Sequence, residues 1–448
     1  MIMILQLAVV LGIMVLVHEF GHFAVAKLCG VRVETFSIGF GKRLFGFHRG
    51  GTDYRISVLP LGGYVKMSGD IPGEAPTGDP GEFNAHPRWQ RILVALAGPV
   101  ANFILAIVLL TGAYMLHNEV SNYRGGPAIS DYVQSNTPIA RTGIQTGDTI
   151  VRYDTVENPT WDDIAISTGL NLNQTIRFSY VHNGQRTDTT FFIQSKGDPD
   201  SDFLENLGLF ERVQPTPLEV SSLSPGLPAE AAGLRPGDKI LSIDGIQLHF
   251  VLALIAHLQD LAGKPTNLLI QRGDQQFTLQ ITPILTDTEQ GKGYRLGFLA
   301  VPPPSHVERQ PFVRALRSSL HDNKKSSMLI IEIVRRMFTR QVSVRSLAGP
   351  IGIGEQIHQA AALPGWMPII SLMAYISINL GILNLLPIPI LDGGMILFLL
   401  IESIMRKDVN VQLKERVYQV AFVCIIVFAA FIIFNDITHL PLFAHIKP

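Results

Sequence analysis

Four long apolar runs constrain the fold of this chain more than any other feature of its sequence. They cover residues 2–27, 92–116, 367–387 and 417–434. Each is near the ~20 residues that an α-helix needs to cross about 30 Å of hydrocarbon. A soluble domain usually carries about 25% charged residues, whereas here the charged share is 16%. The sequence therefore predicts a polytopic α-helical membrane protein with four transmembrane helices, embedded in a lipid bilayer.

The first run could also be read as a cleaved signal peptide. However, no Lys or Arg precedes its apolar part, and the run contains His18-Glu19-Phe20-Gly21-His22. An export signal would not place such groups in its apolar core. We therefore expect a retained helix.

Lys and Arg residues in the short connections predict the orientation of the spans. Nine lie from the end of the first run, counting Lys27, to the start of the second, and four lie between the last two, whereas the N-terminal tip has none and the C-terminal tail has only Lys447. Positively charged short loops stay in the cytoplasm. We therefore expect both termini and the long middle segment, about residues 118–365, to face outward.

Charge and cysteine content exclude two other classes of protein. The net charge is −1, so no overall field favours nucleic acid as a partner. The two cysteines, Cys29 and Cys424, lie in or beside apolar runs and imply no disulfide framework.

The middle segment contains an internal repeat at an offset of 90 residues. Each copy contains a Gly-Asp pair, which predicts a turn before a strand at 149–153 and 239–243. The identical positions are Pro138/Pro228, Gly143/Gly233, Gly147/Gly237, Asp148/Asp238 and Asp154/Asp244. A Leu-Gly-hydrophobic segment follows each copy, at 207–210 and 296–299.

The repeat resembles tandem PDZ domains of the circularly permuted bacterial kind, each an α+β unit. PDZ domains capture peptides by adding a strand to a sheet edge. The resemblance therefore implies capture of peptide C-termini, while a rigid spacer or size filter remains the alternative. Residues 312–340 after the repeat predict a basic, partly amphipathic helix, which either lies on the outer membrane surface or packs against other helices.

The first apolar run carries residues suited to metal chemistry. His18 and His22 are four residues apart, so they share one face of a helix. Glu19 stands beside them, and H-E-x-x-H on a helix is the zinc metalloprotease signature. An ionisable group at the centre of a membrane span costs about 2.5–3.5 kcal/mol, so three within five residues indicate function. A proton relay in a transporter, or a short span with the motif at its mouth, remains possible.

A catalytic zinc needs a third protein ligand and an open position. In the third run, Pro387 and Pro389 predict the end of a helix and an extended stretch. Asp392 follows that stretch, near the cytoplasmic end by the topology above. His18 and His22 lie toward the same end of the first run, so the depths agree. Asp392 is therefore the expected third ligand.

The motifs at 18–22 and 384–393 resemble those of the site-2 protease family of intramembrane zinc metalloproteases, over essentially the whole chain. The resemblance implies Zn²⁺ held by His18, His22 and Asp392, with Glu19 as general base. It implies regulated intramembrane proteolysis in the bacterial inner membrane, of single-span proteins already cut on the periplasmic side. An anti-sigma factor and remnant signal peptides are the implied substrates. A membrane-anchored PDZ scaffold with a vestigial motif is the competing class.

Two further features could bind substrate. Residues 31–47 and 53–67 look like strands joined by a turn at 48–52, and the resemblance implies a membrane-associated β hairpin there. Gly62, Gly63 and Tyr64 would then offer an edge strand to the substrate, unless the hairpin is only a cap. Asn379 and Asn384 could hydrogen-bond an unwound peptide, or could hold helices together.

The sequence predicts the following domain boundaries. Transmembrane helices lie at 1–28, 92–117 and 417–436, and the third span with its motif at 366–402. The remaining segments are the β region 29–91, PDZ-like domains 118–215 and 216–305, a helical segment 306–365, a cytoplasmic connection 403–416 and an outer tail 437–448. Two Gly-Pro segments, 96–102 and 347–352, echo each other and are assigned to helix packing.

Overall fold

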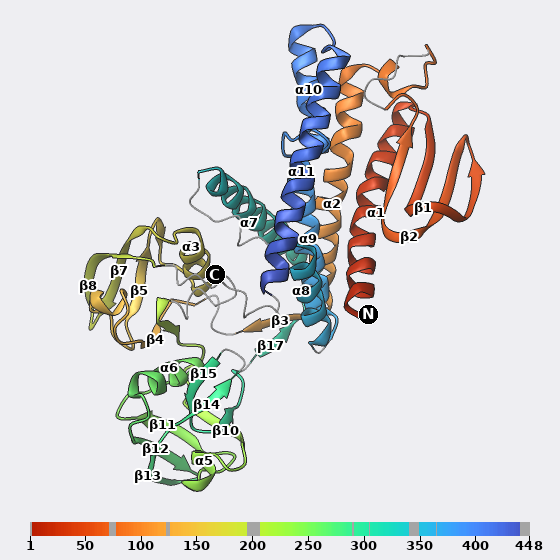
Figure 1. Cartoon of the computed structure of the whole chain (residues 1–448). Coiled ribbons are helices and arrows are strands. Elements are labelled where there is room, and N and C mark those ends of the chain that lie inside the picture. Colours follow the sequence, from red (N-terminus) through yellow and green to blue (C-terminus); the bar gives the residue numbers. More distant parts are fainter. Residues whose placement is uncertain are drawn as a thin grey trace. The chain divides into compact units, whose positions relative to one another are not determined.

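The computed structural model describes residues 2–70, 78–121, 126–194, 207–288, 291–303, 305–339, 349–363 and 365–439. Most of the expected tail and part of the second Gly-Pro segment lie outside this description. The chain divides into two compact units (Figure 1). The first contains residues 1–118, 308–335 and 343–448, and the second contains residues 119–307 and 336–342.

Four helices in the described chain are long and apolar enough to cross a membrane. They are α1 (Ile2–Cys29), α2 (Arg88–Leu116), α9 (Met367–Asn384) and α11 (Val411–His439). The four predicted spans are therefore confirmed. The second helix begins four residues before the apolar run and the fourth begins six residues before it, because polar residues extend the helices beyond their apolar parts.

The third span is broken where the prolines predict. Helix α9 ends at Asn384, and α10 (Asp392–Met405) begins after a non-helical stretch. A Cβ on Gly393 would lie 2.3 Å from the carbonyl oxygen of Leu385, and one on Gly394 would lie 2.3 Å from that of Ile388. Only glycines at these two positions therefore allow α10 to begin so close to the non-helical stretch that precedes it. This close packing fixes the position of Asp392.

A bent sheet packs beside α1. It consists of β1 (Val33–Arg49) and β2 (Thr52–Met67), with the turn at Gly50-Gly51. The first half of β1 pairs with both halves of β2: Ile38 lies opposite Gly63 and also opposite Ile56. The segment Gly63–Met67 therefore forms one edge of the sheet. A short 3-10 helix, η1 (Phe83–Ala85), follows, and Phe83 joins a core cluster with Val33 and Val94.

Two more helices belong wholly or mainly to the first unit. Helix α7 (Phe312–Phe338) is amphipathic, and its Ser319 Oγ donates a hydrogen bond to Ile107 O on α2 at 3.0 Å. Helix α8 (Pro350–Ala362) begins against α11, where the Asp436 carboxylate accepts backbone N–H groups at 2.9 to 3.2 Å. This carboxylate satisfies N–H groups that the first turn of a helix leaves free.

The second unit contains two similar copies of one arrangement. The first copy has sheet orders β6-β5-β7-β8 and β4-β9, and the second has β13-β12-β11-β10-β16. A bridge between Ile129 and Thr149 joins the two parts of the first copy.

The first copy comprises β4 (Ser130–Val133), η2 (Ala140–Thr142), β5 (Thr149–Tyr153), β6 (Val156–Glu157), α3 (Trp161–Leu170), β7 (Thr175–His182), β8 (Gln185–Phe192) and β9 (Leu209–Glu211). The second comprises β10 (Leu218–Leu223), α5 (Pro228–Ala231), β11 (Lys239–Ile243), α6 (Val251–Leu261), β12 (Thr266–Arg272), β13 (Gln275–Ile281) and β16 (Phe298–Ala300).

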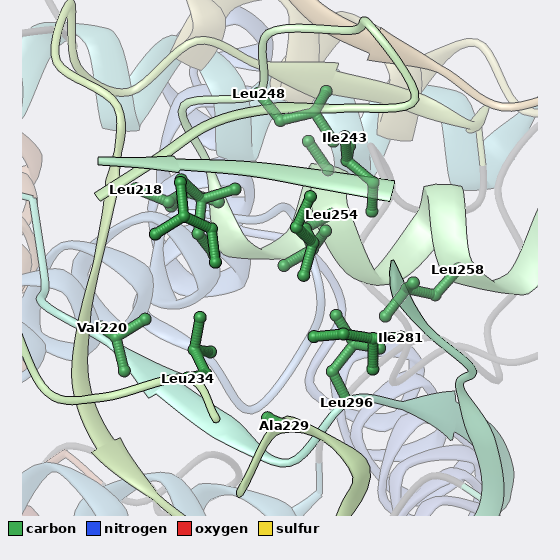
Figure 2. Close-up of a cluster of buried hydrophobic side chains, with 14 of the residues drawn as sticks. Leu218, Val220, Ala229, Leu234, Ile243, Leu248, Leu254, Leu258, Ile281 and Leu296 are labelled. Carbon is green, nitrogen blue, oxygen red and sulfur yellow. The ribbon is translucent and has the colours of Figure 1, made fainter. Parts of the chain in front are cut away.

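Four strands of the described chain form two separate pairs outside these sheets. A hairpin, β14 (Ile284–Thr288) and β15 (Gly291–Arg295), precedes β16, and β3 (Asn118–Ser121) pairs with β17 (Ser305–Glu308). Each copy has its own apolar core. Figure 2 shows the core of the second copy, where Leu218, Ile243 and Leu254 lie among other buried aliphatic side chains.

The repeated Gly-Asp pairs have the same structural role in both copies. Asp148 Oδ2 accepts a hydrogen bond from Gln145 N, and Asp238 Oδ2 accepts one from Arg235 N, both at 2.8 Å. The preceding glycines have φ angles of 91° and 87°, which favour glycine. The strands predicted after these turns, β5 and β11, are confirmed with the predicted bounds.

Hydrogen bonds to two carboxylates join the two copies. Asp131 of β4 is fully buried and accepts hydrogen bonds from His249 N at 2.7 Å and Phe250 N at 3.0 Å. Asp260 of α6 accepts from Tyr132 Oη at 2.8 Å and Ser135 N at 2.7 Å. Burial, followed by the Asp260 carboxylate, raises the pKa of Tyr132 well above its ordinary value, so its hydroxyl remains a donor. Removing the Asp131 carboxylate would leave the buried His249 N–H unpaired.

Candidate metal centre

The structure brings His18, His22 and Asp392 together from opposite ends of the sequence. Helix α1 places both imidazoles on one face, and the start of α10 places the carboxylate against them. His18 Nε2 lies 3.1 Å from Asp392 Oδ2 and 3.1 Å from His22 Nε2, and His22 Nε2 lies 3.4 Å from Asp392 Oδ1. Both histidines are buried.

These three side chains fit a zinc ion by their chemistry and spacing. Two imidazole nitrogens and one carboxylate oxygen are a common ligand set of catalytic zinc. Ligands at about 2.0–2.1 Å from a tetrahedral ion stand roughly 3.3 Å apart, close to the observed separations. Asp392 Oδ2 is buried without a hydrogen-bond partner in the described chain, as expected of an atom that binds a cation.

Helix α2 supports the two histidines from behind. His22 Nδ1 lies 2.7 Å from Val94 O, so Nδ1–H donates to this carbonyl and Nε2 keeps its lone pair toward the site. A Cβ on Gly98 would lie 2.3 Å from His22 Nε2 and 2.7 Å from His18 Cε1. Sequence reasoning assigned Gly98 to helix packing. Its packing partners are in fact the two imidazole rings.

Glu19 lies between the histidines and the sheet edge. Its Oε2 accepts a hydrogen bond from Val65 N of β2 at 3.0 Å. A Cβ on Gly63 would lie 3.9 Å from Glu19 Cγ. The edge strand and the proposed base are therefore in direct contact.

A cavity of about 350 Å³ opens at this centre. Its walls come from α1, α2, the end of β2, α9 and the stretch before α10, and they include His18, Glu19, His22 and Asp392. Ile390 in that stretch has a φ of 88°, a strained conformation for a β-branched residue. Such strain persists only where the surrounding structure enforces it, and here it precedes Asp392 by two residues.

The predicted substrate-binding residues lie at different distances from the cavity. Asn384 lines it, with Nδ2 3.3 Å from His18 Nε2, whereas Asn379 on α9 does not line it. Gly62 and Gly63 lie beside α1. A Cβ on Gly62 would be 3.3 Å from Val15 Cγ1. The Tyr64 ring stacks on Phe40 and its hydroxyl accepts from Arg55, outside the cavity lining.

Val65 and Met67, which line the cavity, belong to the strand predicted at 53–67. Sequence reasoning missed Asp70, which also lines the cavity, and did not assign Asn102 of α2, which contacts His18, to the site. Only Asn102 carried a usable signal, because a polar residue in an otherwise apolar span often has a specific partner.

Comparison with known proteins identifies the family. The family model of peptidase family M50 matches residues 6–428. The regulator of sigma-E protease RseP of Salmonella typhimurium is 34% identical over 451 residues, covering 96% of this chain and 97% of that protein. The RseP of Escherichia coli is 33% identical over 448 residues with the same coverage.

Two further proteins are similar to all or part of this chain. A Vibrio cholerae protein whose name describes it as a zinc metalloprotease is 31% identical over 454 residues, covering 96% of this chain and 97% of that protein. The PDZ domain of an SdrC-like protein from Listeria monocytogenes is 23% identical, with 20% of this chain and 92% of that domain covered. Its TM-score of 0.18 carries no argument about the fold. The resemblance to site-2 proteases, and within them to the regulator of sigma-E protease, is confirmed. The chain therefore belongs to peptidase family M50, as a multi-pass membrane zinc metalloprotease.

Proposed function

We propose that this protease makes the second cut in regulated intramembrane proteolysis, within the membrane-spanning segment of its substrate. One observation carries the proposal: His18, His22, Glu19 and Asp392 meet at a cavity whose walls include helices apolar enough to cross a membrane. The implied substrates are single-span proteins first cut on the periplasmic side, namely an anti-sigma factor and remnant signal peptides. The relatives named as regulators of sigma-E protease support this choice.

His18, His22 and Asp392 are the proposed zinc ligands. When bound there, zinc would polarise the scissile carbonyl and lower the pKa of the attacking water toward about 7. Glu19 would accept the proton of that water and deliver it to the leaving amine. The contact from Val65 N–H orients the Glu19 carboxylate. The other side chains of the cavity would limit the access of bulk water.

A helical substrate must unwind before its carbonyls can react, since they are already hydrogen-bonded. The edge Gly63–Met67 of the β1–β2 hairpin borders the cavity and could pair with an extended peptide. Asn384 lies where its amide could bind the unwound backbone. We propose that this membrane-associated hairpin presents the substrate, with Gly62, Gly63 and Tyr64 in the presenting strand. Asn379 is proposed as a weaker contributor.

We propose that the two copies of the second unit are tandem PDZ-like domains in the periplasm. The resemblance to site-2 proteases implies the inner membrane, and the Lys and Arg distribution of the connections supports this orientation. The hydrogen bonds of Asp131 and Asp260 hold the copies together. A fixed pair favours the role of spacer or size filter over independent capture of peptide C-termini.

The test is the replacement Glu19→Gln, with Glu355→Gln on α8 as control because Glu355 is exposed. Glu19→Gln should abolish cleavage of a membrane-embedded substrate by purified protein, while zinc stays bound in equal amount. Glu355→Gln should cleave as the wild type does. Undiminished cleavage by Glu19→Gln would refute the proposed mechanism.

A further inference from the structure

Asn102 is a fully buried polar residue in the middle of α2. Its Nδ2 lies 3.2 Å from His18 Nδ1, and its backbone carbonyl accepts a hydrogen bond from Ser377 Oγ of α9 at 2.9 Å. Its Oδ1 is buried and has no hydrogen-bond partner in the described chain. An unsatisfied buried polar atom costs about 1–3 kcal/mol. Packing alone would therefore favour an apolar residue at this position.

The two nitrogens of His18 explain why an amide stands there. Its Nε2 faces Asp392 and His22, so this nitrogen must be unprotonated to bind a cation. In a neutral imidazole the proton then resides on Nδ1 and requires an acceptor. For His22 the acceptor is Val94 O. For His18 the group in contact with Nδ1 is the Asn102 amide.

Asn102 can supply that acceptor without any movement of the backbone. The two ends of a side-chain amide have nearly the same shape. A half turn about the Cβ–Cγ bond therefore places Oδ1 against Nδ1–H in the space that Nδ2 occupies. Gly98, one turn earlier on α2, leaves room for the same ring, since a Cβ there would lie 2.7 Å from His18 Cε1.

We propose that Asn102 is a positioning residue of the metal centre, which fixes the Nδ1-protonated form of His18 and directs Nε2 at the ion. Helix α2 then orients both histidines, one through Val94 O and the other through Asn102. This inference rests on the proposed function, in which His18 is a zinc ligand. Loss of such a supporting hydrogen bond typically lowers metal affinity 10- to 100-fold.

Three variants test the role of Asn102. Asn102→Leu removes both polar atoms at similar size and should weaken zinc binding about 10- to 100-fold, measured by competition with a chelator. Asn102→Asp keeps an acceptor for Nδ1–H and should restore most of the affinity. Thr111→Val is the matched control, because Thr111 is also buried on α2 and its hydroxyl has no partner among the described residues. Its zinc affinity should equal that of the wild type.

The visible spectrum of the cobalt-substituted protein reports ligand geometry independently of catalysis. It should change in Asn102→Leu and not in Thr111→Val. Wild-type zinc affinity together with an unchanged spectrum in Asn102→Leu would overturn the role of Asn102. Full zinc retention in His18→Ala would instead overturn the ligand set, so the two failures are distinguishable.

A measurement on the wild type decides the question if Asn102→Leu does not fold. In zinc-loaded protein labelled with ¹⁵N-histidine, nuclear magnetic resonance should show His18 protonated at Nδ1 and metal-bound at Nε2. Binding through Nδ1 would overturn the inference, because Asn102 would then occupy the position of the ion.

Discussion

At the scale of single residues, small side chains decide whether the metal centre can form. Helices α1 and α2 cross where Gly21 meets Ala97, since a Cβ on Gly21 would lie 2.3 Å from Ala97 O. Gly98 then faces the imidazole of His22 directly. The ligands thus depend on the closeness of the two helices as well as on their own spacing.

The replacement Gly98→Ala should therefore damage the site. Overpacking costs about 1–3 kcal/mol, which corresponds to roughly 5- to 150-fold in zinc affinity if the rings move to relieve it. Gly112→Ala on the same helix is the control, because a Cβ there meets nothing within 4 Å. Chelator competition should show weaker zinc binding in Gly98→Ala alone. Equal affinity in both variants would show that the rings adjust freely.

Sequence reasoning identified some residues of the metal centre and missed others, for a physical reason. The spacing of His18, Glu19 and His22 is local to one helix, so the sequence could place them together. Asp392 required a second argument from the prolines and from matching depth. The contacts of Gly98 and Asn102 depend on how α2 crosses α1, and no pattern within α2 specifies that crossing.

At the scale of elements, the far end of the β1–β2 hairpin is unusually apolar. Leu44, Phe45 and Phe47 have 54%, 73% and 60% of their surface exposed. An exposed apolar cluster of this kind usually contacts a partner or a membrane. The hairpin follows α1, a predicted span, so lipid is the expected partner.

A spin label at position 45 tests this expectation. In a background with Cys29→Ser and Cys424→Ser, a label on Phe45→Cys in lipid bilayers should be accessible to oxygen and shielded from a water-soluble nickel complex. A label on Gln276→Cys, at an exposed position of β13, should show the opposite. If both labels are equally accessible to nickel, the hairpin lies in water.

The sequence predicted the elements better than their pairing. The four spans and the turn of the hairpin are where expected. The pairing of one half of β1 with two segments was not foreseen, because it needs the bends at Gly39 and Gly41, whose φ angles are 88° and 91°. Glycine in a strand signals a possible bend, but not the strand that will pair across it.

At the scale of the whole molecule, the proposed mechanism separates the chemistry from most of the soluble chain. The Lys and Arg distribution predicts that the connection before α2 and the connection before α11 lie in the cytoplasm. His18 and Asp392 lie near those connections in the sequence, whereas the second unit leaves from the opposite end of α2. A periplasmic domain pair could then discriminate untrimmed substrates while cleavage occurs near the cytoplasmic side.

Single cysteines in intact cells test this orientation. In the cysteine-free background, Lys407→Cys lies between α10 and α11, and Asp274→Cys lies in the exposed turn between β12 and β13. A membrane-impermeant maleimide added outside should label position 274 once the outer membrane is permeabilised, and position 407 only after the inner membrane is opened. Both variants must first retain zinc, so that the labelled protein is the folded one.

Labelling of both positions from the same side would place the second unit and the connection before α11 in one compartment. The periplasmic filter and the cytoplasmic site could not then both be right, since α9 and α10 would no longer separate the second unit from that connection.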